Sequence, residues 1–152
     1  MDFTYGMENT EMIVVENSGG KVSVTDYYSK AFEQPSKTIS NTFSLVNGAT
    51  NSSGIFATFK RSLKTGNSLN KVLEVGLVTP ISFAYLTTPN KGFSRHNNIG
   101  KGLLVMGSTS DTSTFIAGDN IVTPSVQLDS NFGLSWIFTS NSIIFTFQVN
   151  PI

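Results

Sequence analysis

The stretch that decides the fold lies near the end of the chain, where residues 132–149 read FGLSWIFTSNSIIFTFQV. Apolar and polar residues alternate on both sides of the short polar segment Thr139-Ser140-Asn141, which is the pattern of two strands joined by a turn. A strand of this kind buries one face and exposes the other to solvent. The segment therefore predicts a β-hairpin whose apolar face packs against a second sheet.

The same signal recurs along the rest of the chain. Residues 12–15 and 21–25 flank Asn17-Ser18-Gly19-Gly20, which predicts another hairpin with a glycine turn. Helical spacing is poor throughout. Further strands are expected over 39–46, 54–61, 72–78, 81–86, 102–106, 114–117 and 126–128, with a polar loop at 47–54. About nine or ten short strands separated by turn residues predict an all-β protein, an antiparallel β-sandwich of immunoglobulin-like architecture.

Composition excludes several function classes. Ten basic and ten acidic side chains give no net charge, and no basic cluster is dense enough for a nucleic-acid footprint. The chain has no cysteine, so disulfides, thiolate nucleophiles and iron–sulfur ligands are excluded. No apolar run is long enough to cross a bilayer, and no leader opens the sequence.

The uncharged polar surface favours an extracellular or cell-surface location. Charged residues make up only 13% of the chain, and serine, threonine and asparagine take their place. Asn51-Ser52-Ser53 is an N-glycosylation sequon in the predicted loop, so we expect a glycan at Asn51. Because the start of the sequence lacks the pattern of a leader, we expect either an intracellular protein or a processed or excised piece of a longer one. The segments at the two ends of the chain favour the second.

A single histidine, His96, limits the metal chemistry. One imidazole cannot build a zinc cage, but it can be one axial ligand of a haem whose other ligand is methionine. Met7 follows a glycine in a loop and is the candidate partner. Met12 is the rival, although it begins an apolar strand and is expected to pack in the sandwich.

Several segments, taken in order, resemble the DOMON family. They are Gly6-Met7-Glu8-Asn9-Thr10-Glu11 before an apolar strand, Arg61-Ser62-Leu63-Lys64-Thr65-Gly66-Asn67, Ile81-Ser82-Phe83-Ala84-Tyr85, and His96 with Gly100 after it. The family contains the haem- or sugar-binding β-sandwiches of cellobiose dehydrogenase cytochrome domains and plant ascorbate-reducible cytochromes. The resemblance covers about the first 105 residues. Asn67 departs from the acidic residue of the family pattern.

The resemblance to the b-type cytochrome subgroup implies a haem b held by Met7 and His96 for electron transfer. The apolar walls of such a site would come from nearby aromatic side chains, and an arginine beside the histidine is a candidate partner for a haem propionate. Arg61 is expected instead to be a structural ion-pair partner. The expected cofactor-binding residues besides the two ligands are Tyr5, Phe83, Tyr85, Phe93 and Arg95.

The order of the segments is rotated relative to the family. The hairpin at residues 132–149 resembles the one that should precede Tyr5-Gly6-Met7. Three explanations stay open: a circular permutation, donation of the hairpin to the next subunit, or a piece cut from a tandem array. Donation or an array is favoured, because a lone sandwich without its opening hairpin would expose an apolar edge. The expected divisions are a sandwich body at 1–106, a polar linker with short strands at 107–127 and a C-terminal hairpin at 128–152 that completes this or a neighbouring sandwich.

An enzyme is not expected. The chain has one histidine and no cysteine, and it contains neither a Gly-x-Ser-x-Gly elbow nor a phosphate-binding glycine loop. The alternative to the cytochrome is a haem-free structural or adhesive module, or a filament subunit, with carbohydrate binding as an option. Partners under either reading are copies of the same sandwich joined by strand exchange; the redox partner is not specified by the sequence.

Overall fold

The computed structural model describes residues 7–52, 54–74, 78–86, 96, 98–105, 114–117, 120–122, 125–127 and 132–149. Within these ranges the chain forms strands and no helix, and hence no helix long and apolar enough to cross a membrane. Every strand pair is antiparallel. The expected all-β, antiparallel class is confirmed. The strands are β1 (Thr10–Ser18), β2 (Lys21–Ser29), β3 (Ser36–Lys37), β4 (Phe43–Asn51), β5 (Gly54–Ser62), β6 (Val78–Tyr85), β7 (Asn98–Val105), β8 (Thr114–Ala117), β9 (Asn120–Val122), β10 (Ser125–Gln127), β11 (Phe132–Phe138) and β12 (Ser142–Val149).

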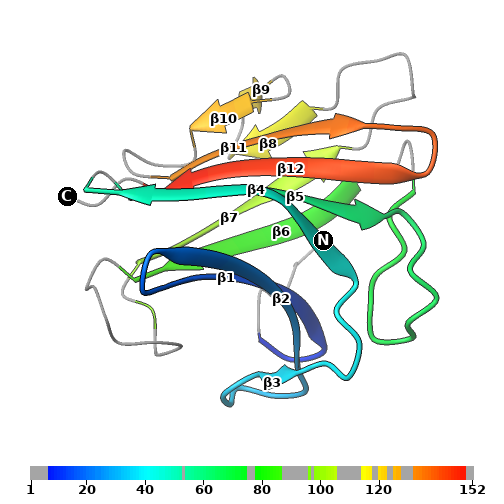
Figure 1. The fold of residues 1–152 in the computed structure, drawn as a ribbon. Helices are drawn as coiled ribbons and strands as arrows, with labels where there is room; N and C mark the ends of the chain where they lie inside the picture. Colours follow the sequence, from blue (N-terminus) through cyan, green and yellow to red (C-terminus); the bar gives the residue numbers. More distant parts are fainter. Residues whose placement is uncertain are drawn as a thin grey trace.

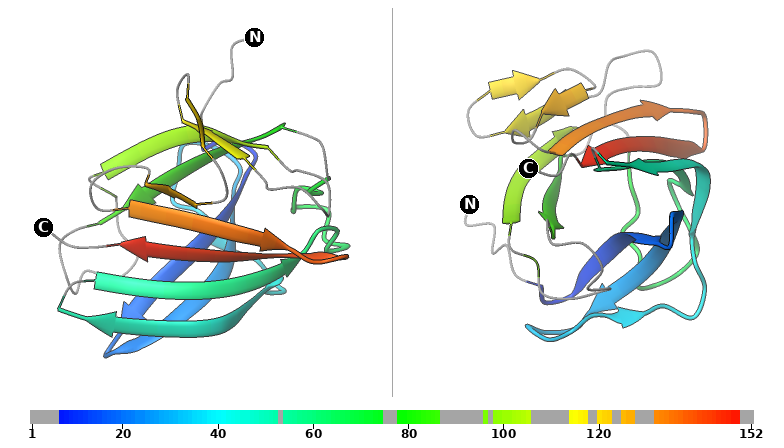
Figure 2. Two further views of the ribbon diagram at one scale, coloured as in Figure 1. Left: turned by 90° about the horizontal axis from the view of Figure 1, so that it is seen from above. Right: turned by 60° about the vertical axis from the view of Figure 1, so that its left-hand side comes forward.

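The strands form three sheets that share one core. Their orders are β1-β2-β3, β10-β11-β12-β5-β4 and β6-β7-β8-β9. Figure 1 shows the five-stranded sheet above the β1–β2 hairpin. In the right-hand view of Figure 2 the blue β1–β2 hairpin lies across from that sheet, and green β6–β7 lies along one side between them.

The first hairpin has the predicted turn. β1 and β2 pair from Thr10↔Ser29 to Ser18↔Lys21, which leaves Gly19 and Gly20 as a two-residue connection. Both glycines have positive φ, 59° and 86°, the conformation that a tight type I′ hairpin turn requires. The Asn17 side chain accepts a hydrogen bond from the Gly20 amide at 3.0 Å, which fixes this register.

The loop predicted at 47–54 was wrong. β4 continues to Asn51 and pairs with β5 through a two-residue turn, with one bulge between Leu45 and Asn47. Most polar side chains of β4 are exposed, so they stay in contact with water while the backbone pairs with β5. β4 passes close to β2 at Gly48. Glycine permits this close approach, because a Cβ at position 48 would lie 2.8 Å from the Cβ of buried Val22.

The strand predicted over 72–78 was also wrong in its described part. Residues 71–74 are not a strand; instead Leu73 is buried in the core and its amide donates to the Leu63 carbonyl at 2.9 Å. β6 begins at Val78 and runs through Pro80. Proline is tolerated there because β6 is the edge strand of its sheet.

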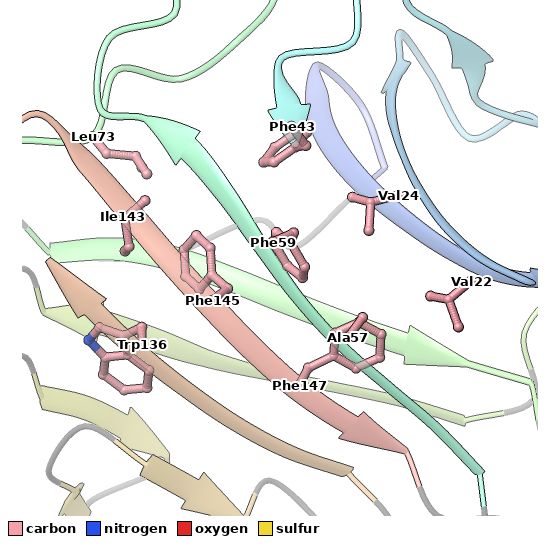
Figure 3. Packing of buried hydrophobic residues seen from close by; sticks show 10 residues of the cluster. All are labelled: Val22, Val24, Phe43, Ala57, Phe59, Leu73, Trp136, Ile143, Phe145 and Phe147. Carbon is pink, nitrogen blue, oxygen red and sulfur yellow. The ribbon is translucent and has the colours of Figure 1, made fainter. Parts of the chain in front are cut away.

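The C-terminal hairpin completes the core of its own chain. β11 pairs with β12, and β12 pairs with β5 from Ser142↔Ser62 to Val149↔Ile55. Trp136 is only 2% exposed. In Figure 3 the aromatic side chains of β5 and β12 lie beside Val22 and Val24 of β2. The arrangement in this structure is therefore in cis, while the division of the chain into body, linker and hairpin stays a prediction. The core consists of Val22, Val24, Phe43, Ala57, Phe59, Leu73, Trp136, Ile143, Phe145 and Phe147.

We predict that Gly48→Val destabilises the protein by about 1–3 kcal/mol, because the new side chain overlaps Val22. The free energy of unfolding from urea titration measures the loss. Ala49→Val is the matched control, since Ala49 is exposed on the same strand. Equal stability of the two variants would contradict the close crossing of β4 over β2.

Candidate functional site

Met7 lies in a turn just ahead of β1. It precedes the strand by three residues and is half-buried. Met12 lies within β1 itself, on the face opposite to Val15, which packs against the core. The two methionines thus differ in setting: Met7 lies outside the strand ladder, whereas Met12 pairs with Tyr27 of β2.

His96 lies at one end of the β6–β7 hairpin. The last residue of β6, Tyr85, pairs with Asn98, the first residue of β7, so the connecting segment containing His96 is at that end. The His96 side chain is exposed. Met7 leads into the three-stranded sheet and His96 into the four-stranded sheet, so the two candidate ligands come from separate sheets around one core.

Two of the expected aromatic side chains are on β6 near this end. Tyr85 is buried, and Phe83 is half-buried on the same face of the strand. Phe83 pairs with Gly100 across the hairpin, and its ring lies where a Cβ on Gly100 would be, with Cζ only 2.0 Å from that position. Glycine at 100 therefore allows the ring to lie over the β7 backbone.

Of the four other residues predicted for the site, the structure describes one. Asn51 is exposed at the end of β4, where the chain turns into β5, a position with space for a glycan. Tyr5, Phe93 and Arg95 lie outside the described residues.

A buried ion pair joins β1 to β5. Glu11 Oε1 and Arg61 Nη1 are 2.9 Å apart, and the two side chains are 7% and 4% exposed. The other Glu11 oxygen accepts the Lys71 amide at 2.7 Å, and Arg61 Nη2 donates to the Lys71 carbonyl. The guanidinium also lies over the Phe43 ring, 5.6 Å from its centroid. The expected structural role of Arg61 as an ion-pair partner is confirmed.

A second carboxylate extends this network into β2. Asp26 is fully buried. Its Oδ2 accepts from Thr42 Oγ1 at 2.8 Å and from Asn70 Nδ2 at 3.0 Å. The same Asn70 nitrogen donates to Glu11 Oε1 at 3.0 Å. The Asn70 side chain thus links the two carboxylates, while Glu11 alone forms the ion pair with Arg61.

Burial dominates the electrostatics of the pair. It raises the pKa of Glu11 above the ordinary value of 4.5, with Asp26 adding to the rise and Arg61 and the Lys71 amide opposing it. Burial also lowers the pKa of Arg61, while the two carboxylates counteract that shift. Low dielectric penalises the charged form of each group, so the pair holds the sheets in place at a desolvation cost.

Sequence reasoning missed Asp26 and Asn70. The signal for Asp26 was present, because Val22, Val24 and Asp26 alternate along β2 and therefore share one face. A carboxylate on a core-facing position must find partners. Asn70 lies in a loop, and nothing in its neighbourhood in the sequence indicates burial.

The described part of the chain contains no group of three or more His, Cys, Asp or Glu side chains arranged for a metal ion. The two donors expected from the sequence are instead the thioether of Met7 and the imidazole of His96. These are the ligand types that a porphyrin iron accepts on its two axial positions.

Comparison with known proteins gives one family. The model of the DOMON domain matches residues 3–84, a range that includes Met7, the Glu11–Arg61 pair and Phe83. Domains of this family bind haem or sugars. No curated protein and no solved structure matches the chain.

We predict that the unfolding free energy of the wild type, relative to Glu11→Gln, falls as the pH rises. The pKa of Glu11 is higher in the folded than in the unfolded chain, so the folded state favours the proton. That contribution to stability is complete below about pH 4.5 and is lost as the pH rises through the folded pKa.

Urea titrations between pH 4 and pH 7 (about the range over which a carboxyl of this kind titrates) measure the difference. Glu8→Gln is the matched control for the loss of a carboxylate, because Glu8 is exposed three residues earlier. If the unfolding free energy of the wild type relative to Glu11→Gln stays constant or increases with pH, Glu11 is not desolvated.

Proposed function

The chain belongs to the DOMON family, and on that premise we propose that its sandwich binds haem b through Met7 and His96 for electron transfer. The family binds haem or sugars. The choice of haem is carried by one observation: both donor side chains lie outside the strands and outside the core cluster. Neither is therefore committed to holding the fold together.

The residues present fit such a group chemically. The thioether of Met7 is half-buried and the imidazole of His96 is exposed, so both have surface available to a ligand. A bound porphyrin also needs apolar contact. Phe83 and Tyr85 supply it from β6, at the end of the hairpin to which His96 belongs.

The proposed roles of the chain's own residues follow from this chemistry. A haem held by a thioether and an imidazole would supply one-electron transfer. Met7 and His96 would hold the group, and Phe83 and Tyr85 of β6 would give it apolar contact. None of these residues is proposed to act as an acid or a base, so we propose an electron carrier and not an enzyme.

We predict that the purified protein takes up haemin, and that Met7→Ala and His96→Ala each lose the low-spin spectrum of a doubly ligated iron. Titration with haemin, followed by visible spectra before and after dithionite reduction, measures both effects. Met12→Ala is the matched control, because it removes a thioether from the neighbouring strand without touching Met7. Far-ultraviolet circular dichroism verifies that each variant is folded.

A wild-type protein whose mixture with haemin keeps the visible spectrum of free haemin would overturn the proposal. The sandwich would then belong with the sugar-binding or structural members of the family. Loss of the spectrum in Met12→Ala, with Met7→Ala unaffected, would instead exchange the ligand and keep the cofactor.

A further inference from the structure

The turn that carries Met7 has an unusual backbone. Asn9, immediately before β1, has φ = 51° and is the one non-glycine residue with positive φ in the part of the chain that the structure describes. Side chains disfavour this left-handed conformation, and asparagine tolerates it better than most residues. The turn therefore adopts a conformation that only a few residue types permit.

Two hydrogen bonds tie this turn to the first sheet. The Tyr28 hydroxyl donates to Asn9 Oδ1 at 3.2 Å, which joins the turn to β2. The Thr10 hydroxyl donates to the Glu8 carbonyl at 3.1 Å, which joins it to the first residue of β1. One residue further on, the buried pair of Glu11 and Arg61 fixes β1 itself. The turn is thus held at a defined angle to a fixed strand.

This arrangement contributes nothing to the core. Glu8 and Asn9 are exposed, and no described residue ahead of β1 belongs to the core cluster. Residues in sparsely populated backbone conformations are often retained where the backbone orients a functional group. Asn9 fits this description, because its side chain is hydrogen-bonded and it lies outside the core cluster. The group to be oriented is Met7, two residues earlier.

We infer that Asn9 is a positioning residue, which sets the direction in which the Met7 thioether leaves β1. The inference rests on the proposed role of Met7 as an iron ligand. Its mechanism is conformational: the left-handed turn directs the chain away from the line of β1, and Tyr28 holds it there.

The first test compares haemin binding by Asn9→Val and Asn9→Gly. Valine is β-branched and excluded from the left-handed region, whereas glycine retains it. We expect Asn9→Val to weaken haemin binding by about tenfold, as loss of a residue that orients a ligand does, and to lose the low-spin spectrum. Asn9→Gly keeps the left-handed conformation but loses the hydrogen bond from Tyr28, so we expect it to bind haemin less tightly than the wild type and more tightly than Asn9→Val. Asn47→Val, an exposed site on β4, is the matched control.

The second test does not depend on haem. In protein labelled at the methionine methyl groups, Asn9→Val is expected to shift the Met7 signal and leave that of Met12 in place. Tyr28→Phe, which removes the donor to Asn9, is expected to give a smaller shift in the same direction.

The outcomes separate the two ideas. If the wild type takes up no haemin, the proposed function fails, and the methionine spectra still decide whether Asn9 sets the orientation of Met7. If the wild type binds haemin and Asn9→Val gives the same affinity, spectrum and Met7 signal, the inference is overturned while the proposed function stands.

Discussion

The structure depends most on one buried interaction, the ion pair between Glu11 and Arg61. It joins β1 of the three-stranded sheet to β5 of the five-stranded sheet, and the Lys71 backbone and Asn70 add further hydrogen bonds to the two side chains. Removing one partner of such a pair leaves an uncompensated charge in a low-dielectric interior, which costs far more than the pair contributes when intact. The ion pair and its hydrogen bonds therefore help to determine the relative position of the two sheets. Apolar contacts alone would permit small shifts between the sheets.

This constraint separates the parts of the chain that maintain the fold from those that are free to bind. The core is filled by side chains from β2, β4, β5, β11 and β12 together with Leu73, and it uses neither Met7 nor His96. Met7 leaves a strand that the ion pair fixes, through a turn that Asn9 and Tyr28 hold. Met7 and His96, the proposed haem ligands, thus lie outside the strands and outside the core cluster.

Alternation of apolar residues predicted the class of the fold and most strands closely, and the hairpin at 132–149 was correct in both strands. It failed where backbone pairing decides the structure. The polar residues of β4 indicated a loop, but β5 offered a partner strand and Gly48 allowed the crossing. Residues 72–74 were apolar enough for a strand, yet the Lys71 backbone is bound by Arg61 and Glu11, and Leu73 fills the core from a loop. At the candidate site, Met7 and His96 as donors and Phe83 and Tyr85 as lining residues stay predictions. The buried contacts of Asp26 and Asn70 could not be predicted, because they arise between residues far apart in the chain.

The most direct test of this account is a double-mutant cycle on Glu11 and Arg61 with methionine at each position. Unfolding free energies of Glu11→Met, Arg61→Met and the double variant separate the pairwise interaction from the effect of each side chain. The account predicts that each single variant loses about 3–5 kcal/mol and that the double variant regains part of this loss, since neither partner of the pair then remains buried alone, while Asp26 keeps its hydrogen bonds from Thr42 and Asn70. Losses below about 1 kcal/mol that simply add would contradict it, because that is how an exposed ion pair behaves.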